Sequence, residues 1–222
     1  MGNKIYLPGD YICEAEGLIK GHGTELSSNK ILSTYFGHVK QINKLITVVP
    51  VSPCRYVPEV GDVVVGRVTQ IFNKKWRVET NSKNDTVLSL SAISLPGVAQ
   101  RRKSEEDEIN MNRFFDVDDL LVCEVQKVNK SGSAALHTRN DKYGKLSNGV
   151  FIQVPHILLC PLKARFLKFD GIEIIAGCNG YLWIQASEDS AESYRRVSFA
   201  CKRIRELSFQ GMKINLEAIF DE

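Results

Sequence analysis

Two short basic segments contain residue types that could contact an anionic ligand. The first, Lys74-Lys75-Trp76-Arg77, places three cations beside one indole ring, and the second, Arg101-Arg102-Lys103, is an uninterrupted basic triplet. Lysine and arginine neutralise phosphates, and an exposed aromatic ring stacks on bases without reading their sequence. The two segments therefore predict a sequence-tolerant face for single-stranded nucleic acid, formed by Lys74, Lys75, Trp76, Arg77, Arg101, Arg102 and Lys103.

The pattern around both segments leaves alternatives open. The strand that contains Trp76 alternates, so either Trp76 and Val78 or the two residues Arg77 and Glu79 face the core. If Trp76 is a core residue, the basic side chains alone would contact the ligand. The basic triplet is followed by an acidic run at 105–108. This segment is either a solvated loop and helix start, or a basic triplet that faces phosphate while the acidic run begins a helix, where carboxylates are favoured.

The sequence gives no indication of an active site. Hydrolysis of RNA would require clustered carboxylates that hold metal ions, or a histidine pair for acid–base catalysis. Asp116, Asp118 and Asp119 precede a predicted strand, where carboxylates usually cap a turn, and the four histidines are scattered. We therefore expect a protein that is not an enzyme and that has no catalytic residues, metal or cofactor.

Composition limits the function classes further. The chain has 222 residues, 43% of them hydrophobic, and a formal net charge of only +3, so any nucleic-acid contact must depend on locally clustered cations. Six cysteines occur without a C-x-x-C pair, which is typical of reduced thiols in an intracellular protein. There is no apolar run of about 18 residues, no signal peptide and no myristoylation signal, so we expect no membrane association.

Residues 1–55 are predicted to form a small N-terminal β domain. Pro8-Gly9-Asp10 has the composition of a tight turn, and the segments 34–39 and 42–51 form a strand pair that turns at Lys40-Gln41. Prolines at 50, 53 and 58 then indicate a stiff connection to the next domain.

Residues 56–146 have the pattern of a five-stranded OB-type barrel. Short alternating segments separated by polar or glycine-containing turns favour a closed β architecture. The five predicted strands are Val63–Ile71, Trp76–Thr80, Thr86–Ile93, Leu120–Val128 and Ser133–Thr138.

Residues 147–222 are predicted to form an α+β domain. We expect a strand at 150–154, a short helix at 155–167 that Pro161 breaks or kinks, and a strand at 181–185. Asp189-x-x-Glu192 resembles a capping box and predicts a helix that ends near Phe209. Its apolar positions, spaced for one buried face, are Val197, Ala200, Cys201, Ile204 and Leu207. The basic residues between 195 and 213 form either a solvated face or a contact to RNA or an acidic neighbour.

The stretch from His137 to Pro155 connects the last two domains. It contains three basic residues, but Tyr143 and Gly144 between them suggest a fixed turn packed between domains. We therefore predict an inter-domain or partner contact formed by Arg139, Lys142, Tyr143, Gly144 and Lys145.

A resemblance to a known family gives these patterns a context. The opening Gly61-Asp62 with 63–68 resembles an S1 RNA-binding domain, which is an OB barrel. Leu95-Pro96-Gly97 with 101–105, and 136–139 with 142–146, resemble the S1/KH cap subunits of the eukaryotic RNA exosome, of the ribosomal-RNA-processing protein four type. The resemblance extends from about Pro8 to the C-terminus and is strongest between 56 and 185.

The resemblance implies a fold and a role. The expected fold is mostly β, with a small N-terminal β domain, an S1 barrel and a KH-like α+β domain. The expected role is that of a non-catalytic RNA-binding cap subunit, which stabilises an RNase PH-like ring and guides RNA into its channel for 3'-5' processing and decay, including rRNA processing. Expected partners are the ring subunits, other S1-containing cap subunits and single-stranded RNA, in a hetero-oligomer found in the nucleus, nucleolus and cytoplasm. The alternative is a free-standing S1/KH RNA-binding adaptor in translation or RNA quality control.

The loop Gly177-Cys178-Asn179-Gly180 is the Gly-x-x-Gly segment of the KH-like domain. Glycines in such a loop let the backbone approach phosphates closely. KH domains that bind RNA alone usually have basic residues at its two central positions, and this chain has Cys178 and Asn179 there. Two interpretations follow: a tight structural turn, in which Asn179 tolerates a left-handed conformation, or a direct RNA contact.

Overall fold

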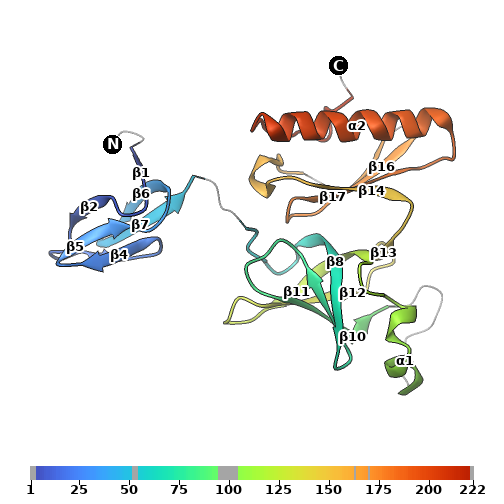
Figure 1. Cartoon of the computed structure of the whole chain (residues 1–222), viewed down its shortest axis with the longest axis horizontal. Helices are drawn as coiled ribbons and strands as arrows, with labels where there is room; N and C mark the ends of the chain where they lie inside the picture. The colour runs from blue at the N-terminus through green and yellow to red at the C-terminus, as the bar shows by residue number, and fades with distance from the viewer. Residues whose placement is uncertain (1–3, 52–54, 95–104, 163, 170, 221–222) are drawn as a thin grey trace. The chain divides into compact units, whose positions relative to one another are not determined.

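The computed structural model describes residues 4–51, 55–94, 105–162, 164–169 and 171–220 (Figure 1). The chain divides into two compact units, Met1–Cys54 and Arg55–Glu222. None of the helices among the described residues has the length and apolar character needed to span a bilayer.

The N-terminal unit contains two small sheets. One has the order β1-β6-β7-β3 and the other the order β2-β5-β4. Their bounds are β1 Ile5–Tyr6, β2 Tyr11–Glu14, β3 Ile19–Lys20, β4 Thr24–Ser27, β5 Lys30–Ser33, β6 Gly37–Ile42 and β7 Leu45–Pro50. Ile31 of β5 and Ile46 and Val48 of β7 are the buried hydrophobic residues among the described part of this unit.

Two turns of this unit test the sequence analysis. At the first turn, Gly9 adopts a positive φ of 94° and the Asp10 carboxylate accepts a hydrogen bond from the Leu7 amide at 2.8 Å, as predicted. The second turn was misplaced: Lys40 and Gln41 lie within β6. The chain reverses after Ile42 because Asn43 adopts a left-handed φ of 54°, a conformation that asparagine tolerates well.

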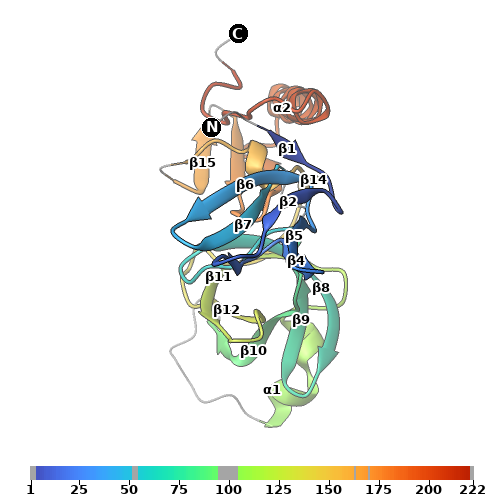
Figure 2. The ribbon, with the colours of Figure 1, turned by 90° about the vertical axis from the view of Figure 1, so that its left-hand side faces the viewer.

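A closed barrel begins the second unit, and Figure 2 looks into it from one end. Neighbouring strands pair in the order β12-β10-β9-β8-β11, and β11 pairs again with β12 to close the ring. The strands are β8 Val63–Phe72, β9 Lys75–Glu79, β10 Thr86–Ile93, β11 Leu120–Val128 and β12 Ala134–Thr138. The predicted five-stranded OB-type barrel is confirmed.

The connection from β10 to β11 contains a short helix. The acidic run begins this helix, α1 (Glu105–Ile109), as predicted, and a 3-10 turn, η1 (Met111–Arg113), follows it. Met111 and Phe115 pack into the barrel core. The basic triplet Arg101-Arg102-Lys103 lies outside the described residues.

The rest of the second unit is an antiparallel sheet covered by one long helix (Figure 1). The sheet has the order β14-β17-β16-β15, with β14 Gly149–Gln153, β15 Phe166–Phe169, β16 Ile172–Ala176 and β17 Tyr181–Ala186. The helix, α2 (Ala191–Phe209), packs on one face of this sheet through Val197, Ala200, Cys201 and Ile204. The prediction of a mostly β chain with a C-terminal helix is confirmed.

Two predictions in this region were wrong in detail. In place of the helix predicted at 155–167, the described residues of this segment contain a single 3-10 turn, η2 (His156–Leu158), and Phe166 already belongs to β15. Pro161 cannot donate a backbone hydrogen bond to a helix, and Phe166 and Leu167 pair instead with β16. The cap of α2 is Ser190 rather than Asp189, because the Ser190 side chain accepts from the Ser193 amide.

Candidate nucleic-acid interface on the barrel

The side chain of Trp76 points into the barrel. Its ring is 0% exposed, its Nε1 donates to the Phe115 carbonyl oxygen at 2.8 Å, and it packs edge-on against the Phe115 ring at 5.4 Å. The prediction that Trp76 is a stacking platform is therefore wrong. In the alternation of β9, Trp76 and Val78 face the core, so only the basic side chains of the predicted face remain on the outer surface of this strand.

The predicted cations on the outer surface differ in how much of their charge is already paired. Lys74 at the β8–β9 turn forms an ion pair with Glu108 of α1 at 2.7 Å. Arg77 lies 3.4 Å from Asp85, and its guanidinium stacks 5.4 Å from the Phe72 ring. Lys75 forms no ion pair with any residue that the structure describes. Of these three cations, Lys75 is the one whose charge is most available to a phosphate.

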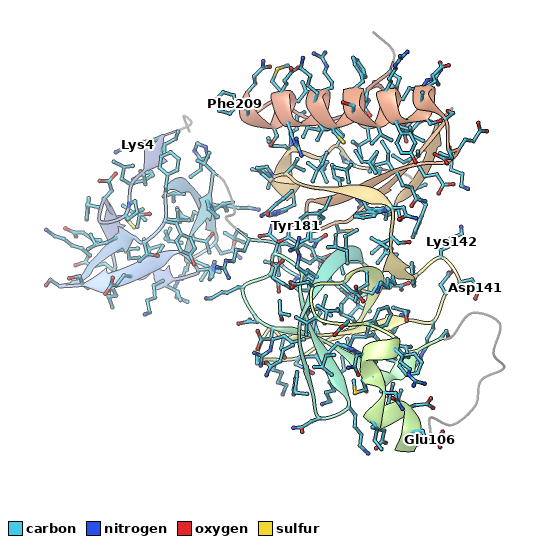
Figure 3. The ribbon with its side chains drawn as sticks, turned by 45° about the vertical axis from the view of Figure 1, so that its right-hand side comes forward. Lys4, Glu106, Asp141, Lys142, Tyr181 and Phe209 are labelled. Carbon is cyan, nitrogen blue, oxygen red and sulfur yellow. The ribbon has the colours of Figure 1, made fainter. Side chains whose placement is uncertain are left out.

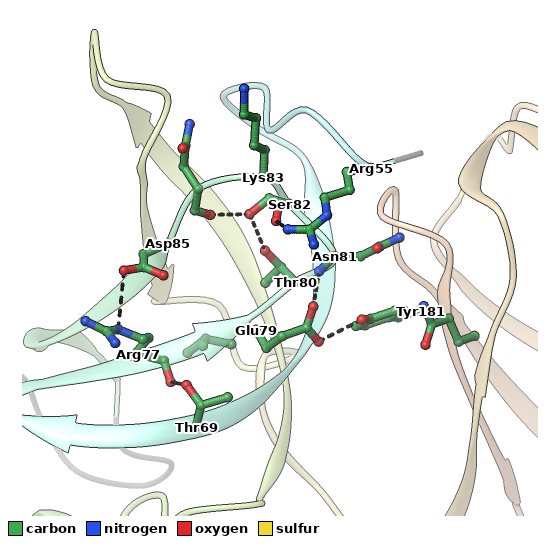
Figure 4. Close-up of a pocket in the computed structure, with 13 residues that line it drawn as sticks. Arg55, Thr69, Arg77, Glu79, Thr80, Asn81, Ser82, Lys83, Asp85 and Tyr181 are labelled. Carbon is green, nitrogen blue, oxygen red and sulfur yellow. Dashed lines mark hydrogen bonds and ion pairs between the residues drawn. The ribbon is translucent and has the colours of Figure 1, made fainter. Parts of the chain in front are cut away.

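A polar groove of about 420 Å³ lies where the outer surface of β9 meets the C-terminal sheet (Figure 4). Residues from β8, from β9 and from the connection to β10 form one side, and Gln153 and Tyr181 of the C-terminal sheet form the other. Arg55 and Lys83 also line the groove. The sequence analysis missed both, because neither belongs to a basic run and the groove exists only once the two domains pack together.

The carboxylates of this groove are already engaged. Glu79 accepts from the Tyr181 hydroxyl at 2.7 Å and from the Asn81 amide at 2.6 Å. Burial, together with this hydrogen bond to Glu79, raises the pKa of Tyr181, which keeps the hydroxyl protonated as a donor. Asp85 is the partner of Arg77. Both carboxylates of the groove, Glu79 and Asp85, thus already interact with other groups of the chain.

Two cations of the groove remain available to an anion. The Arg55 guanidinium reaches only the Ser82 carbonyl oxygen, at 3.4 Å, and Lys83 makes no ion pair or side-chain hydrogen bond within the described ranges. Arginine can bind a phosphate through two parallel hydrogen bonds, and lysine acts as a point charge. The groove therefore presents two cations that can bind a phosphate.

The Gly177–Gly180 loop packs against the barrel. The Asn179 side chain is fully buried, and its amide donates to the carbonyl oxygens of Val65 at 2.7 Å and Thr80 at 3.0 Å. The Cys178 amide donates to the Val63 carbonyl oxygen at 2.8 Å. A Cβ on Gly177 would lie 2.9 Å from the Val65 nitrogen. This environment favours the structural interpretation of the loop over direct RNA contact.

The conformation of this loop differs from expectation in one respect. The left-handed residue is Gly180, with φ of 83°, and not Asn179. A side chain on Gly180 would also collide with the Val154 carbonyl oxygen. Burial raises the pKa of the Cys178 thiol to about 11, so this cysteine is a poor nucleophile at neutral pH.

The connecting stretch holds the barrel and the C-terminal sheet together through Tyr143. Its hydroxyl donates to Glu124 of β11 at 2.7 Å, and its ring stacks on Phe166 of β15 at 6.1 Å. Lys142 lies over the same Phe166 ring, at 5.9 Å. Gly144 begins the short strand β13 (Gly144–Leu146), which extends the barrel sheet beside β11, and Lys145 pairs with Asp119 at 2.6 Å. Four of the five residues predicted to contact a neighbouring domain or partner are thus used within the chain.

Arg139 is the fifth of those residues, and its role stays a prediction. Its backbone amide donates to the His137 ring at 3.3 Å.

The aspartates before β11 close a turn. The Asp119 carboxylate accepts a hydrogen bond from the Asp116 backbone amide at 2.8 Å. Within the described residues, no group of three His, Cys, Asp or Glu side chains is placed to hold a metal ion.

Comparison with known proteins agrees with this geometry. Residues 55–127 match the family model "RRP4, S1 domain", and residues 5–42 match "Exosome complex exonuclease RRP4 N-terminal region". A solved chain whose name refers to an exosome complex RNA-binding protein has a TM-score of 0.53 at 18% identity, and the match covers 75% of this chain and 94% of that one. At this identity the structural match supports the fold alone.

Curated relatives are similar over most of this chain. Exosome complex component rrp4 of Schizosaccharomyces pombe is 41% identical over 85% of this chain and 57% of its own length. The Bos taurus and Mus musculus components named RRP4 are 43% and 45% identical, over 85% and 81% of this chain. The aligned regions span 64% and 61% of those two relatives. With both family models matching in order along the chain, the closed barrel and these relatives show that the chain belongs to the RRP4 family of exosome complex components.

Proposed function

We propose that this chain is a non-catalytic RNA-binding cap subunit of an RNA exosome. In this role it stabilises a ring of RNase PH-like subunits, lies beside other S1-containing cap subunits, and guides single-stranded RNA into a central channel for 3'-5' processing and decay, including that of ribosomal RNA. The observation that carries the proposal is a closed S1-type barrel whose outer surface presents three cations, Lys75, Arg55 and Lys83, that form no ion pair with the described residues.

An open apolar sheet face in the N-terminal unit supports a role within an assembly. Cross-strand partners lie on the same side of a sheet, so the register places Ile19, Leu45 and Ile42 in one row, and Ile5, His38 and Val49 in another. The apolar members of the two rows are 38–58% exposed. A free-standing adaptor would leave this face in water, whereas a subunit buries such a face against a neighbour.

The proposed role also implies a cellular location. Ribosomal-RNA processing would place the chain in the nucleus, including the nucleolus, and general RNA decay would place it in the cytoplasm as well. Fluorescence imaging of the tagged chain at its native expression level tests this placement.

RNA protection by a reconstituted complex tests the proposed function. We expect Arg101→Ala, Arg102→Ala and Lys103→Ala together to shorten the RNA segment that the complex protects from nuclease, without releasing the subunit from the ring, because fewer phosphates are neutralised. Lys168→Ala, which removes an exposed cation paired with Glu173 in the C-terminal sheet, is the matched control. Unchanged protection by the triple variant would contradict the assigned RNA face.

Two further measurements separate this role from its alternatives. Tight, salt-dependent RNA binding by the isolated chain, with no co-purifying RNase PH-like subunits, would favour the free-standing adaptor. Weak binding by the isolated chain fits the cap role, because several subunits act together at a channel entrance. Degradation of RNA by the pure chain would contradict the non-catalytic assignment.

A further inference from the structure

Helix α2 has an exposed face that the packing of the C-terminal sheet does not use. Its buried positions face the sheet, whereas Arg195, Phe199, Lys202, Arg205 and Phe209 follow each other at steps of four, three, three and four residues. This spacing places the five side chains on one side of the helix. We call them the α2 outer face.

The α2 outer face contains two exposed phenylalanines. Phe209 is 95% exposed at the end of the helix (Figure 3), and Phe199 is 49% exposed, with its ring 6.2 Å from that of Phe220. The two residues are ten positions apart, which corresponds to about 15 Å along the helix axis. Met212, just beyond the helix, is also exposed. Large apolar side chains therefore lie at two separate points of a surface that is otherwise polar.

Positive charge surrounds the two phenylalanines. Arg195 and Arg205 make no ion pair or side-chain hydrogen bond with the residues that the structure describes. Lys202 approaches Glu206 only at 4.0 Å, in an exposed i,i+4 arrangement. Glu192, the other acidic residue of the helix, pairs with Arg196 at 3.1 Å. The outer face thus presents cations that are not neutralised by the helix itself.

We propose that the α2 outer face binds an acidic segment of a partner protein, which places aromatic or aliphatic side chains against Phe199 and Phe209 and carboxylates against Arg195 and Arg205. An arginine side chain binds one carboxylate through two parallel hydrogen bonds. Arg195 and Arg205 could therefore each bind a separate acidic side chain of the partner. Phenylalanine, methionine and arginine are also the residue types enriched where proteins meet.

A protein segment fits this face better than RNA. Glu206 lies between Lys202 and Phe209 along the same side of the helix and would repel the continuous negative charge of an RNA backbone. A peptide can leave this position uncharged while placing carboxylates opposite the arginines. The surface is separate from the barrel cations, so the inference does not depend on the proposed RNA-binding role.

Peptide selection against the full chain tests this inference. A displayed library of random 12-residue peptides is selected on the wild-type chain, with counter-selection on the variant Arg195→Glu, Phe199→Ser, Arg205→Glu, Phe209→Ser. We expect enriched peptides that combine several acidic residues with at least one aromatic or aliphatic residue. Failure to enrich peptides over the variant, or enrichment of peptides without acidic residues, would overturn the proposal.

Single substitutions then assign the binding to named side chains. In fluorescence polarisation with the best labelled peptide, Phe209→Ala and Arg205→Glu should each weaken binding by about tenfold, as is usual for anchoring residues at an interface. Ile109→Ala and Lys130→Glu, an exposed apolar residue and an exposed cation of the barrel domain, should leave the affinity unchanged.

An RNA arm decides between the two kinds of partner. The same variants are titrated with a labelled ten-nucleotide uridine oligomer. If Phe209→Ala and Arg205→Glu weaken RNA binding and not peptide binding, the α2 outer face is an RNA surface and the proposal is wrong. Circular dichroism checks that each variant is folded, which we expect because Phe209 and Arg205 are both exposed.

Discussion

The N-terminal unit and the second unit differ in how completely they bury their apolar side chains. In the N-terminal unit, Ile31, Ile46 and Val48 are buried, while eleven large apolar side chains from Ile5 to Val51 remain exposed. The second unit has two continuous cores, one inside the barrel and one between the C-terminal sheet and α2. A unit of about 50 residues buries too little surface to be very stable alone. The second unit therefore has the buried cores of a stable domain, whereas the first leaves most of its large apolar side chains exposed.

Removing the largest core side chain of the barrel should have the greatest effect on the second unit. We expect Trp76→Ala to lower the free energy of unfolding by about 3–5 kcal/mol, because it leaves a cavity and removes the hydrogen bond to the Phe115 carbonyl. The chain has two tryptophans, Trp76 and Trp183, and both lie in the second unit, so Trp183 fluorescence during urea unfolding reports on this unit in the variant. A loss under about 1 kcal/mol would contradict the core assignment.

A substitution at the contact between the barrel and the C-terminal sheet should have the next largest effect on the free energy of unfolding. Asn179→Leu keeps a similar volume but leaves the Val65 and Thr80 carbonyl oxygens without their side-chain donor, at a cost of about 3 kcal/mol in total. Asn112→Leu, at an exposed position near α1, is the matched control and should change stability by less than about 0.5 kcal/mol. Urea unfolding followed by tryptophan fluorescence measures both. Equal effects in the two variants would show that Asn179 does not join the domains.

A pH dependence should add a smaller effect at the same joint. Burial lowers the pKa of His156, whose ring lies 6.3 Å from that of Tyr56. In the unfolded chain a histidine titrates near a pKa of about 6.5. The folded form disfavours the charged ring, so this contribution to stability is complete above pH 6.5 and is lost as the pH falls through the folded pKa.

The measurement of this pH effect uses a variant that cannot titrate. Urea unfolding midpoints of the wild type should fall between pH 7.5 and pH 5.5, and His156→Gln should show a shallower fall over that range. Parallel pH profiles for the two proteins would exclude a contribution from His156.

The smallest effect on the free chain should come from the open face of the N-terminal sheet. Ile19→Ser with Ile42→Ser should change its thermal unfolding very little, because both side chains are exposed. The same pair should strongly reduce co-assembly with RNase PH-like subunits, measured by size-exclusion chromatography. Thr47→Ala, in the row between the two apolar rows, is a control. Normal assembly of the double variant would contradict the proposal that the open face of the N-terminal sheet contacts a neighbouring subunit.

Local pattern was enough to predict much of the fold. Alternation located Thr86–Ile93 and Leu120–Val128 with the observed bounds, and helical spacing identified the buried side of α2. Both patterns depend on residues within one element, where side-chain direction repeats with a fixed period. The helix predicted at 155–167 was wrong at its end because Phe166 and Leu167 pair with β16, a strand contact that no pattern within the segment shows.

The candidate site shows the same difference between what local pattern predicts and what tertiary contacts decide. The sequence by itself determined that Trp76 and Val78 share one side of a strand and that Arg77 and Glu79 share the other, because the period of two is a local property. Only the tertiary structure decided that Trp76 is inside, that Arg55 and Lys83 line one groove, and that Asn179 joins two domains through a residue 114 positions away. Those outcomes depend on which surfaces bury each other, and burial is a property of the packed chain as a whole.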